Sequence, residues 1–271
     1  MLKKRLIPVV LLKNGLVVQS KKFSRYQVLG NPVTIVERLT NWAADELIYL
    51  DISIERSYDL GRDDLNAGNR NSLLEILSDV AKCCFMPLTF GGGIRTLSDA
   101  VERVQAGADK IAINSKALED SSFISACAND LGSQCVVVSI DALSRGADCW
   151  EVMSHRGQRA TGKSPSEWAK EVEAFGAGEI LINSIDNDGQ GKGFDIQLIQ
   201  SVAEAVTIPV IALGGAGGWH HLEEVLSFTN ANAVAAANIF HYTENSVFNA
   251  KKHLYERGLN IRKPYFDSDK V

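Results

Sequence analysis

Eight short runs of apolar residues are spaced along the chain, and polar or glycine-rich segments separate them. These runs are residues 6–12, 47–52, 86–90, 110–114, 135–141, 179–183, 209–213 and 233–237. Continuous apolarity, without alternation, is typical of strands that are buried on both faces of a parallel sheet. The pattern therefore predicts eight buried parallel strands.

Amphipathic segments lie between these runs. Residues 96–107 repeat apolar side chains at the i, i+3, i+4 and i+7 spacing of one helix face, and residues 71–82 show the same stripe. Thr96 followed by Asp99 predicts a capping box at the start of the first of these helices. Residues 164–175 have a proline near their start, which suits an early helical position. The chain is thus expected to alternate strands with helices.

Eight strand–helix units in a chain of 271 residues match a (β/α)8 TIM barrel, which needs about 250 residues. An open, doubly wound α/β sheet is the alternative, and it requires a reversal of strand order. An internal repeat favours the barrel. A shift of 123 residues places residues 90–93 on residues 213–216, and a shift of 133 places residues 44–49 on residues 177–182. We predict two half-barrels that close one domain over residues 1–271.

Composition excludes several classes of protein. An apolar content of 45% argues against a disordered chain, and a net charge of −5 argues against a nucleic-acid binder. No apolar run approaches the roughly 18 residues of a membrane span. The basic start of the chain precedes a short apolar run without a cleavage site, so we interpret it as a first strand and not as a signal peptide. The five cysteines form no C-x-x-C pair, which predicts buried, reduced thiols in a cytoplasmic protein.

Two glycine clusters follow the third and seventh predicted strands, at the end of a barrel where active sites lie. Glycine lets the backbone approach an anion closely, and the following helix N-terminus favours negative charge. Polar or small residues after the fourth and eighth strands complete each cluster. We expect two anion sites for a ligand with two anionic ends, although two tight turns without a ligand remain the alternative. The predicted binding residues are Gly91, Gly92, Gly93, Asn114, Ser115, Gly214, Gly215, Ala237 and Asn238.

Acidic residues follow two of the strands. Asp141 closes an apolar strand, where a carboxylate is costly unless it is solvated or used, so it is the candidate general acid or base. The alternative is a structural carboxylate that caps a turn. Asp186 and Asp188 lie in a polar loop after the sixth strand and are suited to bind ligand hydroxyls, or else form a solvated turn. His220 and His221 are adjacent and lack partners at ligand spacing, so we expect no metal and no cofactor.

Charged residues stand at the opposite ends of four strands. Arg5, Glu46, Lys110 and Glu179 open the first, second, fourth and sixth strands, with alternating sign. Such residues are expected to form a ring of salt bridges across the barrel floor. That face of a barrel usually serves stability, and the ring can also act as a gate if a molecule must pass through it.

Together these residues resemble the cyclase subunit of imidazole glycerol phosphate synthase, a (β/α)8 barrel of the histidine pathway. The resemblance extends over nearly the whole chain, from residues 1–5 to residues 258–262. The most specific stretches are residues 45–47, 50–52, 90–94, 107–110, 138–142, 176–181, 184–189 and 214–217.

The resemblance implies an ammonia-using synthase. A glutaminase would dock on the barrel floor as the second subunit of a heterodimer, with Asp45 and Asp109 in the interface. Ammonia would pass the charged ring and travel through the barrel to a bis-phosphorylated substrate, which Asp188 and Gly189 help the glycine clusters to hold. Two aspartates serve as general acid and base in that family, and one of them matches Asp141.

The other aspartate is absent. The resemblance and the internal repeat both place it at the end of the first strand, where this chain has Leu11, and leucine cannot transfer a proton. A lysine expected shortly afterwards is Gln19, and a serine or threonine expected on the sixth strand is Asn183. The polar loop over residues 53–71 is longer than is usual in the family, and loops on this face set substrate choice.

Three hypotheses follow. In the first, the chain resembles paralogues that act beside a glutaminase and a sugar-amidating synthetase of bacterial surface-polysaccharide pathways, where an acetamido group becomes an acetamidino group. In the second, it is a working histidine-pathway cyclase that makes imidazole glycerol phosphate and AICAR, with Asp141 and a loop carboxylate compensating for Leu11. In the third, it is a non-catalytic scaffold that channels ammonia. Loss of one of two catalytic carboxylates costs orders of magnitude in rate, which favours the first and third.

Overall fold

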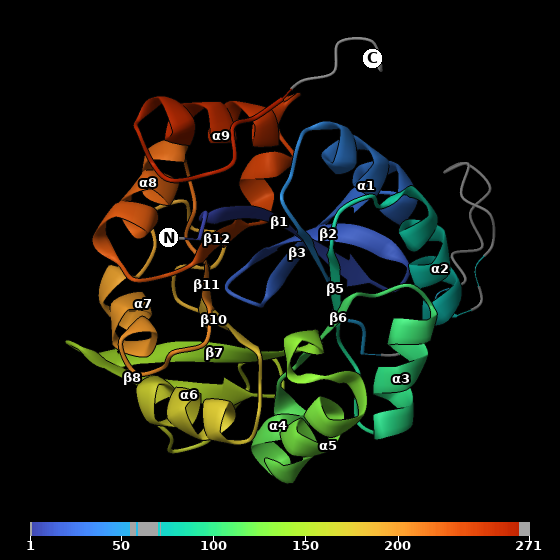
Figure 1. Cartoon of the computed structure of the whole chain (residues 1–271), viewed down its shortest axis with the longest axis vertical. Coiled ribbons are helices and arrows are strands. Elements are labelled where there is room, and N and C mark those ends of the chain that lie inside the picture. Colours follow the sequence, from blue (N-terminus) through green and yellow to red (C-terminus); the bar gives the residue numbers. More distant parts are fainter. Residues whose placement is uncertain (1, 55–57, 59–69, 71, 266–271) are drawn as a thin grey trace.

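The computed structural model describes residues 2–54, 58, 70 and 72–265. Parallel strands form a closed ring at its centre, and helices surround that ring (Figure 1). The ring closes where the last strand pairs with the first, with Arg5 opposite Ala233. The predicted (β/α)8 barrel is thus confirmed. Its strands are β1 (Arg5–Lys13), β4 (Leu47–Asp51), β5 (Leu88–Gly91), β6 (Lys110–Ile113), β7 (Val136–Gly146), β10 (Glu179–Ser184), β11 (Val210–Leu213) and β12 (Ala233–Ala236).

The helices lie on the outside of the ring and include the three that the sequence predicts. In α3, the Thr96 hydroxyl accepts from the Asp99 N–H and the Asp99 carboxylate accepts from the Thr96 N–H, which is the expected capping box. The helices are α1 (Pro32–Asn41), α2 (Leu73–Cys83), α3 (Leu97–Gln105), α4 (Ser115–Glu119), α5 (Ser122–Leu131), α6 (Pro165–Ala174), α7 (Ile196–Ala203), α8 (Trp219–Phe228) and α9 (Ser246–Glu256), with short 3-10 turns η2 (Ser133–Cys135) and η3 (Asn238–Phe240).

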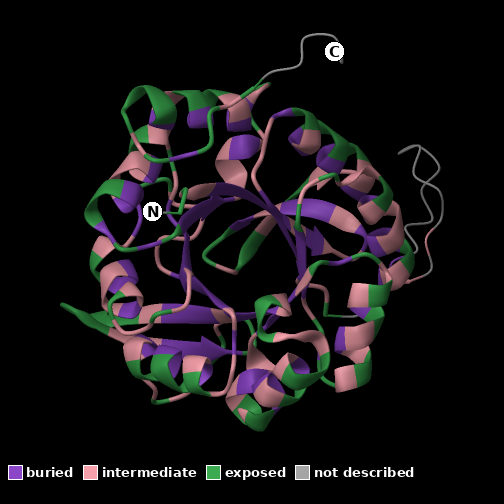
Figure 2. Ribbon diagram, in the orientation of Figure 1, coloured by how far each residue is buried: buried purple, intermediate pink, exposed green. Residues whose placement is uncertain are grey.

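Apolar side chains fill two regions, one on each side of the strands. The larger cluster lies between the strands and the helices, and the smaller one lies inside the barrel. Figure 2 shows the strands of the ring coloured mostly as buried. Burial of each large apolar side chain contributes about 1.5–3 kcal/mol. The interior cluster consists of Ile7, Val9, Ile48, Ala112, Val137, Leu181, Ile211, Leu213, Ala233 and Ala235. Both faces of the strands are therefore buried, which explains their continuous apolarity.

Two β-hairpins extend from the ring, and the sequence interpretation missed both. The first continues β1 into β2 (Leu16–Lys21) and β3 (Arg25–Gly30), and the second continues β7 into β8 (Cys149–Ser154) and β9 (Arg159–Ala160). They follow the first and fifth barrel strands, which are equivalent positions in the two half-barrels. The hairpins thus obey the same internal repeat as the glycine clusters.

Three findings bear on the expectations from composition. Within residues 2–54, 58, 70 and 72–265, none of the helices is long and apolar enough to cross a membrane. The same residues contain no group of three or more His, Cys, Asp or Glu side chains that suits a metal ion. All five cysteines are free, but the expectation of buried thiols is right only for Cys127. Cys83, Cys84 and Cys135 are half-buried, and Cys149 is exposed because it starts the hairpin strand β8 at the surface.

Candidate active site

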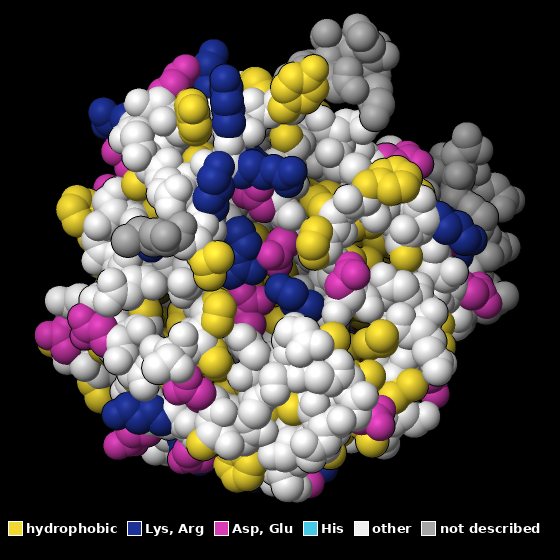
Figure 3. Space-filling view, in the orientation of Figure 1, with side chains coloured by type: hydrophobic (Ala, Val, Ile, Leu, Met, Phe, Trp, Pro, Cys, Tyr) yellow, Lys and Arg dark blue, Asp and Glu magenta, His cyan; other side chains and the backbone are white. Residues whose placement is uncertain are grey.

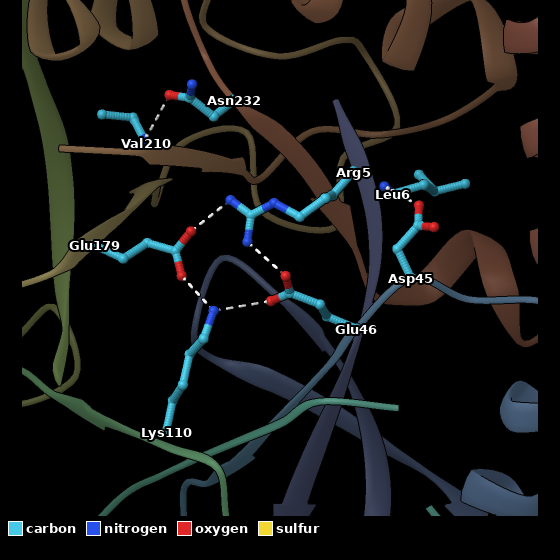
Figure 4. Close-up of polar contacts among 8 residues, drawn as sticks. All are labelled: Arg5, Leu6, Asp45, Glu46, Lys110, Glu179, Val210 and Asn232. Atoms are coloured by element: carbon cyan, nitrogen blue, oxygen red, sulfur yellow. Dashed lines mark hydrogen bonds and ion pairs between the residues drawn. The ribbon is translucent and has the colours of Figure 1, made fainter. Parts of the chain in front are cut away.

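A closed ring of four charged side chains spans the barrel floor, as predicted (Figure 4). Arg5 donates to Glu46 at 2.6 Å and to Glu179 at 2.5 Å, and Lys110 Nζ contacts the same two carboxylates at 3.1 and 2.9 Å. Each glutamate therefore bridges both cations. Burial opposes the charged form of Lys110, but the two glutamates outweigh it and raise its pKa. Figure 3 shows basic and acidic side chains gathered at the centre of the face in view.

Asp45 lies beside this ring and is bonded within its own chain. One carboxylate oxygen accepts from the Leu6 N–H at 2.9 Å, and the other accepts from Lys251 Nζ of α9 at 2.7 Å. We call this contact, in which a side-chain oxygen just before one strand accepts from a backbone N–H at the start of a neighbouring strand, a clasp. Leu6 follows Arg5 and Asp45 precedes Glu46, so the clasp joins the starts of the two strands that supply half of the ring. The carboxylate expected at a partner interface is thus used to position β1 and β4.

Two further residues repeat this clasp around the floor. The Asp109 carboxylate accepts from the Leu88 N–H at 2.8 Å, and the Asn232 side-chain oxygen accepts from the Val210 N–H at 3.1 Å. Each acceptor directly precedes a barrel strand and holds the start of its neighbour. Asp109 precedes Lys110 of the ring, so it too fixes a ring strand. Unlike Asp45, Asp109 is exposed, and its outer surface is open to a partner.

The mouth, at the opposite end of the barrel, is divided into a polar half and an apolar half. Polar residues lie near the ends of the neighbouring strands β6, β7 and β10, whereas apolar residues that belong to the interior cluster or pack against it lie near the ends of β11, β12, β1 and β4. The polar residues are Asn114, Asp141 and Asn183, and the apolar residues are Leu213, Ala237, Leu11 and Leu50. The mouth therefore has a polar side that carries Asp141 and a continuous apolar side.

Asp141 occupies the centre of the polar half. Its carboxylate accepts from Asn114 Nδ2 at 2.7 Å and, at the limit of a hydrogen bond, from Asn183 Nδ2 at 3.5 Å. Burial raises the pKa of Asp141 to about 7, because it outweighs the lowering effect of the two amides, and Asp188 adds to the rise. A group with a pKa near neutrality is best suited to both accept and donate a proton at physiological pH. The candidate acid or base of the sequence analysis thus lies where it can act.

The other carboxylates near the mouth are bonded to their own surroundings. Asp188 lies near enough to raise the pKa of Asp141, but its carboxylate accepts from the Ser20 hydroxyl at 2.8 Å and from the Phe23 N–H at 3.3 Å. Leu11 lies near the end of β1 and pairs with Leu50 and Val18. The Asp51 carboxylate is held by Ser53 and by the Tyr58 hydroxyl at 2.7 Å, and Asp186 accepts from the Ser144 N–H at 2.8 Å. Apart from residues 53, 54, 58 and 70, the long polar loop lies outside the described residues.

The glycine clusters are required by close packing of the backbone. Gly92 has a φ of +103°, and a Cβ there would lie 2.0 Å from the Asp51 carbonyl oxygen. Gly215 has a φ of +115°, and a Cβ there would lie 2.0 Å from the Gly193 carbonyl oxygen. The sequence analysis attributed these glycines to an approaching anion, whereas the chain itself already demands them.

The hairpins lie over both predicted anion sites. The Ser20 hydroxyl donates to Asp188 at 2.8 Å, the Ser20 carbonyl accepts from Asn238 Nδ2 at 2.9 Å, and Gly189 packs directly on that carbonyl. In the other site, the Ser115 hydroxyl accepts from the His155 N–H at 3.0 Å. Each hairpin therefore crosses from its own half-barrel to the predicted anion site of the other half.

A family model described as "Histidine biosynthesis protein" matches residues 5–246, which include every barrel strand and both glycine clusters. The chain belongs to this histidine biosynthesis protein family. It is 44% identical to the protein named imidazole glycerol phosphate synthase subunit HisF in Hyphomonas neptunium, over 262 residues that cover 97% of this chain and 99% of that protein. Membership of the histidine biosynthesis family agrees with the resemblance found in the sequence.

Proposed function

We propose that this chain is the cyclase-type synthase subunit of a glutamine amidotransferase. It takes ammonia from a glutaminase docked on the barrel floor and delivers it to a phosphorylated substrate at the mouth. The observation that carries this proposal is the alignment of three features along one axis, namely the charged ring, the apolar interior and Asp141. The similarity to HisF supports the same assignment.

The charged ring is suited to act as a gate. Arg5 contacts both glutamates through a rigid two-pronged guanidinium, whereas Lys110 contacts both through the single atom Nζ on a flexible stem. Withdrawal of Lys110 therefore opens one side of the ring while Arg5 still bridges Glu46 and Glu179. Lys110 is the moving part of this gate, and the Asp45 and Asp109 clasps keep the other parts in place.

The barrel interior selects the neutral form of the cargo. Transfer of an unpaired ammonium ion into an apolar environment is strongly unfavourable, whereas neutral ammonia has no net charge to desolvate. The interior residues between the ring and the mouth are aliphatic. Ammonia that passes the ring therefore stays unprotonated, which preserves the lone pair that makes it a nucleophile.

Asp141 is the group that handles protons at the mouth. With a pKa of about 7, it is present in both forms at neutral pH. As a carboxylate it removes a proton from the attacking nitrogen, and as a carboxylic acid it protonates a leaving oxygen. The contact with Asn114 fixes the orientation of the carboxylate for both steps.

The finer assignment depends on Leu11. A mechanism that uses two carboxylates loses orders of magnitude in rate without one of them. We therefore assign the ammonia to acetamidino-sugar formation in surface-polysaccharide biosynthesis, with a sugar-amidating synthetase as third partner. The second candidate, a histidine-pathway cyclase making imidazole glycerol phosphate and AICAR, is favoured by the similarity to HisF along 99% of its length. The third, a channelling scaffold, is favoured by the hairpins that cover the mouth.

An isotope-competition experiment tests the proposal. The chain, the glutaminase and the amidating synthetase are supplied with glutamine labelled with 15N at the amide and with excess unlabelled ammonium. We expect the product to retain 15N, because ammonia inside the barrel does not exchange with the bulk. Lys110→Met is expected to lower this retention, whereas Lys252→Gln, on the surface of α9, leaves it unchanged. Equal dilution of the label with and without this chain contradicts the proposal.

A further inference from the structure

The tips of the two hairpins meet above the mouth. A Cβ placed on Gly157 would lie 3.4 Å from the Phe23 ring and 3.1 Å from Ile185, so the tips contact each other and the loop after β10. Each tip is also tied to the barrel, because the Phe23 N–H donates to Asp188 at 3.3 Å and the His155 N–H donates to Ser115 at 3.0 Å. We call these joined tips, residues 21–25 and 155–159, the roof.

The roof has positive charge without counter-charge. Its exposed cations are Lys21, Lys22, Arg25, Arg156 and Arg159. None of these five side chains forms an ion pair with a carboxylate in the part of the chain that the structure describes. Some exposed cations elsewhere have partners, as in the pairs Lys163–Glu171 and Lys252–Glu256, whereas others, such as Arg95 and Lys192, stand singly and without an ion-pair partner among the described residues. Five unpaired cations over the mouth are unexpected in a chain whose net charge is −5.

The backbone of the roof brings these charges together at a cost. Lys21 and Arg25 are directly opposite in the β2–β3 pairing, and like charges in such pairs are destabilising. Lys22 and Phe23 have φ values of 49° and 54°, and Arg156 has a φ of 60°, all in the left-handed region that such residues rarely adopt. Tight hairpin turns require this conformation, so the turns themselves fix where the cations of the two tips lie.

We propose that the roof is an anion site that takes a diphosphate group, such as a nucleotide-linked sugar substrate carries. Several cations from two tips match a ligand with several adjacent negative charges, and the planar guanidinium of arginine binds phosphoryl oxygens in pairs. A diphosphate that bridges both tips relieves the repulsion between Lys21 and Arg25 and holds the roof closed over Asp141, where it keeps water out. That the ligand is the substrate rests on the proposed function, whereas the anion site itself does not.

Titration calorimetry with pyrophosphate on the full-length chain tests the roof directly. We expect binding that weakens as salt increases, because these charges are exposed. The variant Lys22→Gln/Arg25→Gln is expected to weaken binding about tenfold, and Arg156→Gln, on the other tip, weakens it as well. The matched control Lys82→Gln/Lys252→Gln removes two exposed cations outside the roof and leaves binding unchanged.

Three outcomes overturn the inference. If wild type does not bind pyrophosphate, the roof is not an anion site. If the roof variants bind pyrophosphate as well as wild type does, pyrophosphate binds at the glycine clusters instead. Binding of a hexaglutamate peptide without binding of pyrophosphate assigns the roof to an acidic protein partner. The roof variants can lose pyrophosphate binding while neither wild type nor any variant retains 15N in the isotope experiment. That result supports the anion site and contradicts the proposed function.

Discussion

Lys251 offers a sharp test of how the barrel floor is held together. Its side chain is 2% exposed, and Nζ contacts the Asp45 carboxylate at 2.7 Å and the Ala43 carbonyl at 2.9 Å. Lys251→Met keeps the length of the side chain but removes its charge. The buried Asp45 carboxylate then retains only the Leu6 N–H as a partner. Breaking a buried ion pair in this way costs about 3–5 kcal/mol.

That cost is a large share of the stability of a typical domain, which is about 5–15 kcal/mol. Equilibrium unfolding in urea, followed by circular dichroism, measures it as a lower midpoint with an unchanged slope. The neighbouring Lys252→Met is the matched control, since that side chain is 59% exposed, and we expect a change within about 0.5 kcal/mol.

The double variant Lys251→Met/Asp45→Asn separates pairing from packing. Removing both charges relieves the unpaired carboxylate, so the double variant is expected to be more stable than Lys251→Met alone. A loss below about 1 kcal/mol in the single variant refutes the reasoning that this pair is buried and coupled. A double variant that is no more stable than the single one refutes it equally.

Three further predictions concern the mouth and the gate. Burial raises the pKa of Asp141 from 3.8 to about 7, so its favourable contribution to stability is complete below about pH 4 and is lost as pH rises through 7. Asp141→Asn should therefore flatten the pH dependence of the free energy of unfolding in urea between these values. An unchanged pH dependence contradicts this. Gly92→Ala places a Cβ 2.0 Å from a backbone oxygen and should lower the melting temperature far more than Gly258→Ala, which has a φ of +79° but open space around it; equal shifts contradict the packing argument. Lys110→Met leaves Glu46 and Glu179 with Arg5 as their one shared ring cation, so two carboxylates are balanced by a single positive charge. Urea unfolding should then show a loss of stability that falls with added salt, and a loss independent of salt argues against repulsion in the ring.

The barrel strands and the charged ring could be predicted from the sequence because each depends on local patterning. Burial on both faces leaves a continuous apolar run, and a charge at the start of such a run has only the barrel floor to occupy. The first hairpin had a signal that was not used, since Asn14-Gly15 is the favoured two-residue turn between strands.

The roles of Asp45 and Asp109 could not be predicted in the same way. Their carboxylates accept from backbone N–H groups 39 and 21 residues away in the chain, and such contacts exist only after the strands are aligned. The same holds for Asp188 and Asn238, which converge on Ser20 of a hairpin whose placement depends on tertiary structure. The roles of the glycines are also decided by backbone approach between distant loops.

The most direct test of the account is cyclase activity on the bis-phosphorylated histidine-pathway substrate with free ammonium as nitrogen donor. Ammonium bypasses the glutaminase, so a missing partner cannot explain a negative result. Wild type, Leu11→Asp and the matched control Leu11→Asn are compared, with folding checked by circular dichroism. The account predicts no activity in wild type or Leu11→Asn and measurable activity in Leu11→Asp, because only aspartate restores a second proton-transfer group. Cyclase activity in wild type, or no cyclase activity in Leu11→Asp, contradicts the account.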